Sequence, residues 1–322
     1  MHRRSLLALP FAVTLPSAAA RAQDYPDRPV TMIVPYAPGG SADVLARAIG
    51  PAMSEVLGQS VVVELRPGAG GNIGANYVAS NARADGYTVL FASISLSTAP
   101  ALQDIPFDPV KDLVPVFGLG AIPSLMVVSP ASPFRGLADV LAAARARPGE
   151  VTFGSSGPGT GSHLAGELLA AQAGVTFTHV PYRGSGAVYP DLIAQRISFL
   201  LDVAGSSAGQ VSSGAVRAIG ITSTTRAEAF PTVPTIAEQG VPGYEFLTWF
   251  GFFVRTGTPP EALQRLEAAL QHALKAPIVQ ERLRQASAVP VPHEPAAFGR
   301  WYRNEVERWQ SMVQSGRLAR LD

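Results

Sequence analysis

The amino-acid sequence predicts an α/β fold of two domains, each a mainly parallel sheet flanked by helices. Short apolar runs alternate with amphipathic segments along the whole chain, which is the pattern of strands followed by helices. The 322 residues exceed the size at which a single hydrophobic core usually stops growing, about 250–300 residues. Hydrophobic residues form 47% of the chain and charged residues only 15%, so two cores can be buried.

Residues 1–22 have the features of a secretory signal peptide rather than of a folded element. A short basic start is followed by an apolar run, residues 6–20, which is too short to span a bilayer in the mature protein. Small residues at Ala20 and Ala22 match the positions that signal peptidase recognises, so we expect cleavage before Gln23 and a periplasmic protein. Paired arginines near the start leave open whether export is general or twin-arginine.

Eight short apolar runs are predicted strands. Each has four to seven residues, is rich in β-branched types and is bounded by Gly, Pro or Ser. They cover residues 30–36, 61–65, 87–93, 125–129, 151–154, 176–180, 197–201 and 216–222.

Helices are predicted between many of these strands. Over residues 44–57 the apolar positions recur in pairs every four residues, which forms one helix face. A second helix is expected over residues 163–173. Residues 258–261, Thr-Pro-Pro-Glu, resemble a capping box that starts a third helix with a leucine stripe.

Two proline-rich stretches, residues 99–133 and 230–244, carry little helical signal and suggest connections between domains. We therefore predict one domain from residues 23–123 and 246–322, with residues 124–245 inserted as the second. A chain that crosses twice between domains can hinge and close on a ligand.

Composition excludes several classes of function. The chain has no cysteine, which excludes thiol nucleophiles, disulfides and cysteine metal sites. Its histidines lack metal-ligand spacing, so neither a metal nor another cofactor is expected. Removal of the signal leaves 22 basic and 24 acidic residues and no basic stretch, which argues against nucleic acid as a partner. No later apolar run approaches 18 residues, so the mature protein is expected to be soluble.

The first loop, residues 35–43, joins the first strand to the first helix. Gly39 and Gly40 would let the backbone approach a ligand closely, because neither carries a Cβ atom. The helix that follows offers unpaired N–H groups and the positive end of its dipole to an anion. An ordinary tight turn fits this motif equally well.

The second loop, residues 154–163, repeats that arrangement in the inserted domain. Four glycines and four hydroxyls in ten residues provide many hydrogen-bonding groups without a fixed charge, although a flexible surface loop is the alternative. Both loops follow strands, and ligands of open α/β sheets bind beyond the carboxyl ends of strands. Asp202 is the one carboxylate at a strand end near these loops, and it is either functional or a solvated loop acid.

Two competing interpretations are disfavoured. Residues 66–74 resemble a dinucleotide fingerprint, but Ile73 stands where glycine is required, so a close-packed turn with ligand contact through Gly71 or Asn72 is expected. A serine hydrolase using Ser155 or Ser156 lacks a lysine base nearby and a Gly-x-Ser-x-Gly elbow. His163 pairing with a loop serine is the remaining route to catalysis, and we expect no catalytic residues.

The ordered motifs resemble the Bug family, the extracytoplasmic solute receptors of tripartite tricarboxylate transporters. The resemblance runs from residue 25 almost to the C-terminus. It is carried by residues 25–29, 34–43, 66–74, 85–88, 107–112, 162–167, 180–184, 231–238 and 249–251.

The resemblance implies a two-domain Venus-flytrap fold whose two loops grip a carboxylate, an aromatic acid or an amino acid, mainly through backbone amides and bridging waters. It also implies delivery to membrane transporter subunits, with service to a sensor kinase as the alternative, by a protein expected to be monomeric. The implied ligand-binding residues are Tyr36, Ala37, Gly39 and Gly40 on the first loop, Ser155, Ser156, Gly157, Thr160 and Ser162 on the second, and Ser93, Tyr182 and Asp202 along the cleft, where Asp202 would meet an amine or a water.

Three departures from the family pattern bear on the ligand. Pro158 replaces a common Asn and removes donors from the second loop. Leu201 and Val203 flank Asp202 where Phe and Asn are usual, which favours an aromatic or monocarboxylic acid over citrate. Pro51 interrupts the first helix, where a kink is expected because Pro51 cannot donate to the carbonyl of Arg47.

Overall fold

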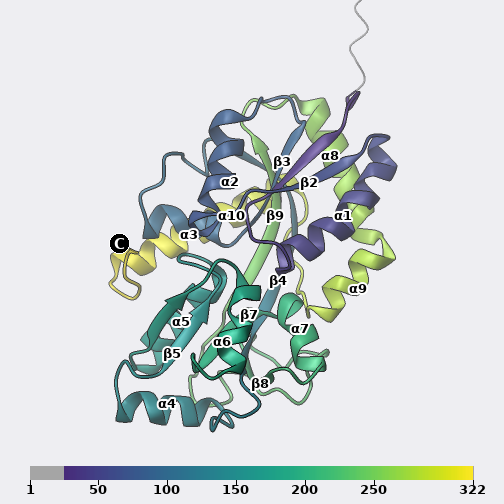
Figure 1. Cartoon of the computed structure of the whole chain (residues 1–322). Helices are drawn as coiled ribbons and strands as arrows, with labels where there is room; N and C mark the ends of the chain where they lie inside the picture. Colours follow the sequence, from purple (N-terminus) through teal and green to yellow (C-terminus); the bar gives the residue numbers. More distant parts are fainter. Residues whose placement is uncertain (1–24, 322) are drawn as a thin grey trace, which may run out of the picture.

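The computed structural model describes residues 25–321, and Figure 1 shows the arrangement of their helices and strands. The strands are β1 (Val30–Val34), β2 (Val61–Leu65), β3 (Thr88–Ser93), β4 (Leu113–Val128), β5 (Thr152–Ser155), β6 (Thr178–Pro181), β7 (Phe199–Val203), β8 (Arg217–Ile221) and β9 (Leu247–Arg255). The α-helices are α1 (Ser41–Leu57), α2 (Asn72–Asn76), α3 (Ser95–Leu102), α4 (Leu137–Ala146), α5 (Gly161–Ala173), α6 (Tyr189–Ile193), α7 (Ala204–Ser212), α8 (Pro260–Lys275), α9 (Pro277–Gln285) and α10 (Pro295–Gln314). The sequence prediction of an α/β fold is confirmed.

The strands follow the order β2-β1-β3-β9-β4-β7-β5-β6, and β8 also pairs with β4. The long strand β4 pairs with β9 as far as Pro123. From Ser124 onward it pairs instead with β7 and, one residue later, with β8. Figure 1 accordingly shows β4 and β9 running through the middle of the molecule, between an upper and a lower group of elements.

The predicted parallel pairing holds for the outer strands only. β1 pairs parallel with β2 and β3, and β5 pairs parallel with β6 and β7, as strand–helix alternation predicts. Every pair that includes β4 or β9 is antiparallel. β4 carries the chain from the upper to the lower group of elements, and β9 carries it back, so the two strands run in opposite directions (Figure 1). Their antiparallel pairing follows from this path and not from a strand–helix–strand unit.

Residues 99–133, interpreted as a connection between domains, are mostly regular structure despite their prolines. The segment contains the end of α3 and all of β4. Its prolines are accommodated because the register shifts after Pro115, and because Pro123 lies where the pairing with β9 ends. The aromatic run after residue 246 is β9, a strand that was not predicted, because its nearly complete burial leaves no polar alternation to reveal it.

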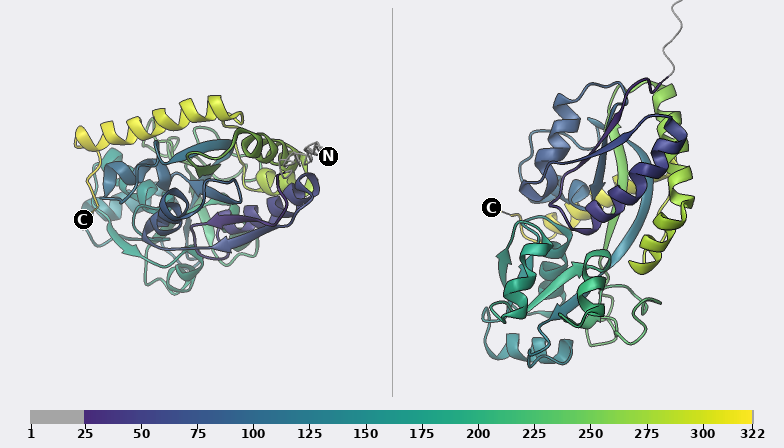
Figure 2. Two further views of the ribbon diagram at one scale, coloured as in Figure 1. Left: turned by 90° about the horizontal axis from the view of Figure 1, so that it is seen from above. Right: turned by 45° about the vertical axis from the view of Figure 1, so that its right-hand side comes forward.

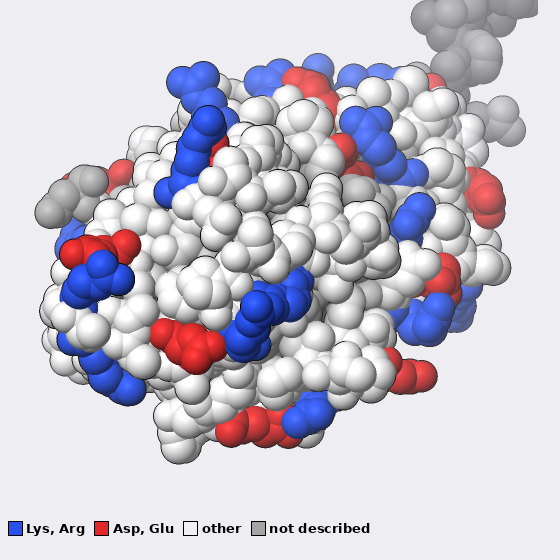
Figure 3. All heavy atoms as spheres, turned by 60° about the horizontal axis from the view of Figure 1, so that its bottom comes forward, with Lys and Arg blue, Asp and Glu red and all other residues white. Residues whose placement is uncertain are grey.

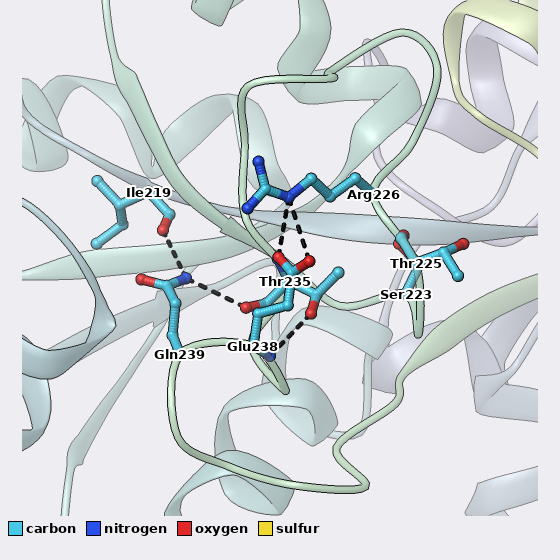
Figure 4. A network of polar contacts seen from close by, with 7 residues as sticks. All are labelled: Ile219, Ser223, Thr225, Arg226, Thr235, Glu238 and Gln239. Carbon is cyan, nitrogen blue, oxygen red and sulfur yellow. Dashed lines mark hydrogen bonds and ion pairs between the residues drawn. The ribbon is translucent and has the colours of Figure 1, made fainter.

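Residues 230–244 were also interpreted as a connection, but they lie against β8. Ile236 N–H donates to the carbonyl of Ile221 at 2.9 Å. Figure 4 shows the polar network of this segment, in which the Arg226 guanidinium pairs with Glu238 and the side chains of Glu238 and Gln239 bond back to the backbone. The return to β9 follows at Phe246, whose N–H donates to the carbonyl of Thr222 at 3.0 Å.

Thr222 forms hydrogen bonds both to β4 and to the residue that precedes β9. Its hydroxyl accepts from Ser124 N–H at 2.7 Å and donates to the carbonyl of Phe246. Its own N–H donates to the Ser124 carbonyl at 3.0 Å. Thr222 is fully buried, so these bonds link both crossings at the level where the pairing of β4 changes.

The predicted first helix is confirmed, and α1 continues through Pro51. It packs along α8, which Figure 2 shows beside it. The predicted capping box before α8 was wrong: the Thr258 hydroxyl donates to the carbonyl of Arg255, and the helix begins at Pro260. Opposite, α10 lies along one side of the molecule and contacts β4 and α3. Within residues 25–321 no helix is both long and apolar enough to cross a membrane.

Candidate functional site

The first loop runs from the end of β1 to the start of α1, as predicted. Gly39 adopts φ +80°, a conformation that favours glycine, and its N–H donates to the Asp43 carboxylate at 2.9 Å. Gly40 is the N-cap residue in an extended conformation, and no side chain caps this helix end. Asp43 is occupied by the loop and by Arg47, whose Nε lies 2.7 Å away. The first N–H groups of α1 therefore have no side-chain partner in the described chain.

Tyr36 and Ser93 are brought together at the ends of β1 and β3. The Tyr36 hydroxyl accepts from Ser93 N–H at 2.9 Å and from Ser93 Oγ at 2.7 Å, and it lies 2.8 Å from Ser95 Oγ. Burial raises the pKa of Tyr36, so the group stays a neutral phenol. Gly71 lies in residues 66–74, the third loop. It packs against this ring, since a Cβ there would lie 3.0 Å from Tyr36 Cε1.

The second loop, between β5 and α5, is held by its own hydroxyls. Ser162 Oγ accepts from Ser156 N–H at 2.9 Å, and it lies within hydrogen-bonding distance of the hydroxyls of Ser156 and Thr160. The Thr160 hydroxyl donates to the carbonyl of Gly157 at 2.6 Å. The four residues therefore form one compact turn at the N-terminus of α5, in place of the flexible loop considered as an alternative.

The Ser155 hydroxyl links this turn to β6. Ser155 is fully buried, and its Oγ lies 2.6 Å from Nε2 of His179 on β6 while accepting from Gly157 N–H at 3.1 Å. His163, at the start of α5, accepts from Gly159 N–H through Nδ1 at 3.1 Å. The structure thus assigns His163 to the loop backbone and not to a loop hydroxyl.

His179 is a residue that the sequence analysis missed. Its ring stacks on that of His163, with centroids 3.8 Å apart. The only signal was a lone histidine within a short predicted strand, and strand position does not reveal that β5 and α5 enclose it. The contact could be found only after the register of β5 and β6 was known.

Three close approaches join the loops to neighbouring elements. A Cβ atom at Gly70 would lie 2.6 Å from the carbonyl oxygen of Pro158, so the third loop contacts the second. A Cβ at Gly184 would lie 2.6 Å from Cβ of Ala37, and one at Gly205 of α7 would lie 3.0 Å from Ser41 Oγ. At these three points the neighbouring elements approach too closely for a side chain, whereas a Cβ at Gly40 would meet only the Ala37 carbonyl oxygen, at 3.8 Å.

Asp202 lies at the end of β7 and is buried, which contradicts the interpretation as a solvated loop acid. Its carboxylate accepts from the hydroxyls of Tyr189 at 2.7 Å and Ser206 at 2.8 Å. Burial nevertheless dominates and raises the pKa of Asp202 to about 6. Tyr182 has its hydroxyl 2.7 Å from Asp191, and burial together with this neighbour raises the pKa of Tyr182 to about 12.

Arg66, at the start of residues 66–74, is engaged by neighbouring side chains. It pairs with Glu64 and stacks over Tyr77, with the guanidinium carbon 3.7 Å from the ring centroid. This placement agrees with a structural role. On the face shown in Figure 3, basic and acidic side chains lie in small mixed groups separated by uncharged surface. Within residues 25–321 no three His, Cys, Asp or Glu side chains are grouped to hold a metal ion.

The contact of Ser155 with His179 meets the distance of a nucleophile–base pair. Two observations argue against hydrolysis by this pair. Ser155 has no exposed surface. Burial and the neighbouring His163 lower the pKa of His179 to about 4, too low for an effective general base near neutral pH.

Comparison with known proteins relates this chain to solute receptors. The family model described as "Tripartite tricarboxylate transporter family receptor" matches residues 45–318. The protein BugT of Bordetella pertussis is 36% identical over 301 residues, covering 92% of this chain and 92% of BugT.

Two solved structures extend the likeness to the fold. The periplasmic binding protein BugD is 31% identical, with a TM-score of 0.86 over 92% of this chain and all of BugD. The R. palustris protein Rpa4515 with adipate is 35% identical, with a TM-score of 0.86 over the same shares of the two chains. The predicted periplasmic-binding-protein fold is thereby confirmed.

Proposed function

Because this chain belongs to the tripartite tricarboxylate transporter family of receptors, we propose that it captures a small carboxylate between its two domains and delivers it to membrane subunits. The mature protein would work in the periplasm after loss of residues 1–22, which lie outside the described residues. We place the domains at residues 23–123 with 246–322, and at 124–245. The change of β4 pairing between Pro123 and Ser124 supports this division.

One observation carries the proposal: the two glycine-rich loops lead into the N-termini of α1 and α5, and neither helix end has a side-chain cap. Gly40 presents backbone without a Cβ atom beside the first of these ends. The N–H groups of Ser156, Gly157 and Gly159 donate within the second loop, so the amides that remain for an anion are those in the first turns of the two helices. Each charge-assisted hydrogen bond contributes a net of about 1.5–3 kcal/mol, so a few amides can replace an arginine. A helix terminus adds roughly 0.3–2 kcal/mol for an anion.

The proposed ligand-binding residues keep their assignment, with one refinement. Ser155 supports the second loop through His179 and would contribute backbone and not its hydroxyl. The proposed contacts are Tyr36, Ala37, Gly39, Gly40, Ser93, Ser156, Gly157, Thr160, Ser162, Tyr182 and Asp202, with Ser155 behind them.

The structure of Rpa4515 with adipate supports a carboxylate as ligand class for this chain as well. A panel of adipate, malate, benzoate and glutamate tests the proposal, because it varies the number of carboxylates, adds an aromatic ring and adds an amine that Asp202 would meet. We expect at least one member to raise the melting temperature of the mature protein, and native mass spectrometry to find a co-purified acid of that class. Failure of every acid to stabilise the protein or co-purify with it would contradict carboxylate capture.

Asp202→Asn should stabilise the unliganded protein at neutral pH. Folding raises the pKa of Asp202 from 3.8 to about 6, so the native state holds a proton that the unfolded state has lost between these values. By linkage, the wild-type protein loses stability as pH rises from 4 through 6, by about 2–3 kcal/mol. Asparagine does not titrate, so the gap in unfolding free energy between variant and wild type should widen over that range. Urea denaturation at pH 4, 5, 6 and 7 measures it.

Asp191→Asn is the matched control. Tyr182 and Arg196 hold the pKa of Asp191 below its usual value, so its contribution has the opposite sign and is greatest above the unfolded value. If the difference in unfolding free energy between Asp202→Asn and the wild-type protein stays constant between pH 4 and 7, burial does not raise the pKa of Asp202.

A further inference from the structure

Two imidazole rings form a stack directly behind the second loop. His163 comes from the first turn of α5 and His179 from β6, and their ring planes are inclined by 19° with centroids 3.8 Å apart. Phe153 of β5 continues the stack on His179 at 4.9 Å. His163 is buried, and His179 is partly buried. The two polar rings therefore lie inside a domain core that otherwise presents phenylalanines from β5 and β7.

Each ring shares a hydrogen bond with the loop. Gly159 N–H donates to His163 Nδ1 at 3.1 Å. Ser155 Oγ already accepts from Gly157 N–H, so its hydrogen is free to point at His179 Nε2, 2.6 Å away. A ring nitrogen that accepts must be unprotonated, which assigns the proton of His163 to Nε2, on the side of Glu167 Oε1 at 3.6 Å.

We propose that His163 and His179 are positioning residues of the carboxylate site: as neutral acceptors they fix the backbone of Gly157 and Gly159, and protonation of the stack releases the second loop. The inference rests on the proposed function, because that loop is the proposed grip on the anion. It goes beyond that function by making the grip dependent on pH. It also gives a role to the two histidines, neither of which is placed against the ligand.

The groups around the two rings explain why protonation would release the loop. A protonated imidazole carries N–H groups on both nitrogens, so a charged His163 would set a donor against the Gly159 N–H. Two cations at 3.8 Å would repel each other, so the stack accepts one proton far more readily than two. Glu167 on α5 is the acidic group that faces the stack, while β5 and β7 present Phe153 and Phe199. Burial and the neighbouring His163 lower the pKa of His179 to about 4, so protonation of the stack is expected below the usual histidine range of pH 5 to 8.

Nuclear magnetic resonance of the unliganded, ¹⁵N-labelled mature protein tests the positioning directly. At pH 7.5 we expect His163 Nδ1 and His179 Nε2 to be unprotonated. Between pH 7.5 and 4, the amide signals of Gly157 and Gly159 should move with the same midpoint as the imidazole signals, while the Gly40 amide of the first loop should not share that midpoint. Second-loop amides that ignore the imidazole titration would overturn the proposal.

Two substitutions of His163 distinguish the effect of its hydrogen-bond acceptor from that of its stacked ring. His163→Asn keeps an acceptor close to the Nδ1 position without a titratable group, whereas His163→Phe keeps the stacked ring without an acceptor. Calorimetry with adipate should show at least tenfold weaker binding for His163→Phe at pH 7.5 and near wild-type binding for His163→Asn. Between pH 7.5 and 4.5 the wild-type affinity should fall by a larger factor than that of His163→Asn, which shares the titration of adipate and of Asp202 but has no titratable group at position 163.

Wild-type affinity in His163→Phe, or a wild-type pH profile in His163→Asn, would contradict the role given to His163. A wild-type protein that binds none of the four acids of the panel would count against the proposed function instead. The amide titration would then still decide whether the imidazoles position the loop, because it needs no ligand and no variant.

Discussion

Gly40→Val is expected to abolish stabilisation by carboxylates while destabilising the unliganded protein only modestly, by about 1 kcal/mol, because valine is a poorer N-cap residue than glycine. Gly40 has φ −79° and ψ 170°, which valine adopts without strain, and a Cβ there meets only the Ala37 carbonyl oxygen at 3.8 Å. The branched side chain would instead fill the space through which an anion reaches the N-terminus of α1. Loss of two charge-assisted hydrogen bonds, each about 1.5–3 kcal/mol, corresponds to a loss of affinity of roughly 100-fold or more.

Thermal shift with and without adipate measures this effect, and two further glycines serve as references. Gly39→Val should lower the melting temperature of the free protein, because Gly39 has φ +80° and valine is strained there. Gly209→Val, on the outer face of α7 with open space around it, should change neither stability nor binding appreciably. Normal adipate stabilisation of Gly40→Val would show that the anion does not approach this loop.

The sequence predicted those parts of the fold that depend on local patterning. The α1 helix and the β2 strand were found because a periodic or β-branched run has clear ends. The β9 strand escaped because its residues are apolar on both faces. The same limit applies to the antiparallel pairing of β4, which follows from the path of the chain between the two halves and from no local signal.

Some features of the candidate site could likewise be predicted from local sequence, and others could not. Loop positions such as Gly39 were predictable because a glycine pair before a helix has a local physical meaning. The burial of Asp202 was not predictable, since its hydroxyl partners on α6 and α7 meet only in the folded chain. The histidine stack is the clearest case, because His163 and His179 are separated by a helix and a loop and pair only through the arrangement of β5 and β6.

Gly205→Leu is expected to weaken carboxylate binding without contact with the ligand. Gly205 lies at the start of α7, where a Cβ would sit 3.0 Å from Ser41 Oγ of α1 and 3.3 Å from Cβ of Ala286. In the proposed domain division Ser41 and Ala286 belong to one domain and Gly205 to the other. A leucine would therefore act as a wedge between them. Overpacking typically costs about 1–3 kcal/mol, and if this cost falls on the closed state, the Kd rises roughly 5- to 150-fold.

Gly209→Leu is the matched control, because Gly209 lies on the same helix with open space where the added side chain would go. Calorimetry with adipate should separate the two variants, while small-angle scattering should show that adipate compacts Gly209→Leu and the wild-type protein more than Gly205→Leu. Equal affinity in both leucine variants would mean that α7 and α1 need not meet when ligand binds. Weak binding with full compaction would instead place the effect of Gly205 within the ligand site, through Ser41 at the N-terminus of α1. The pair of measurements thus distinguishes closure of the two domains from direct damage to the carboxylate grip.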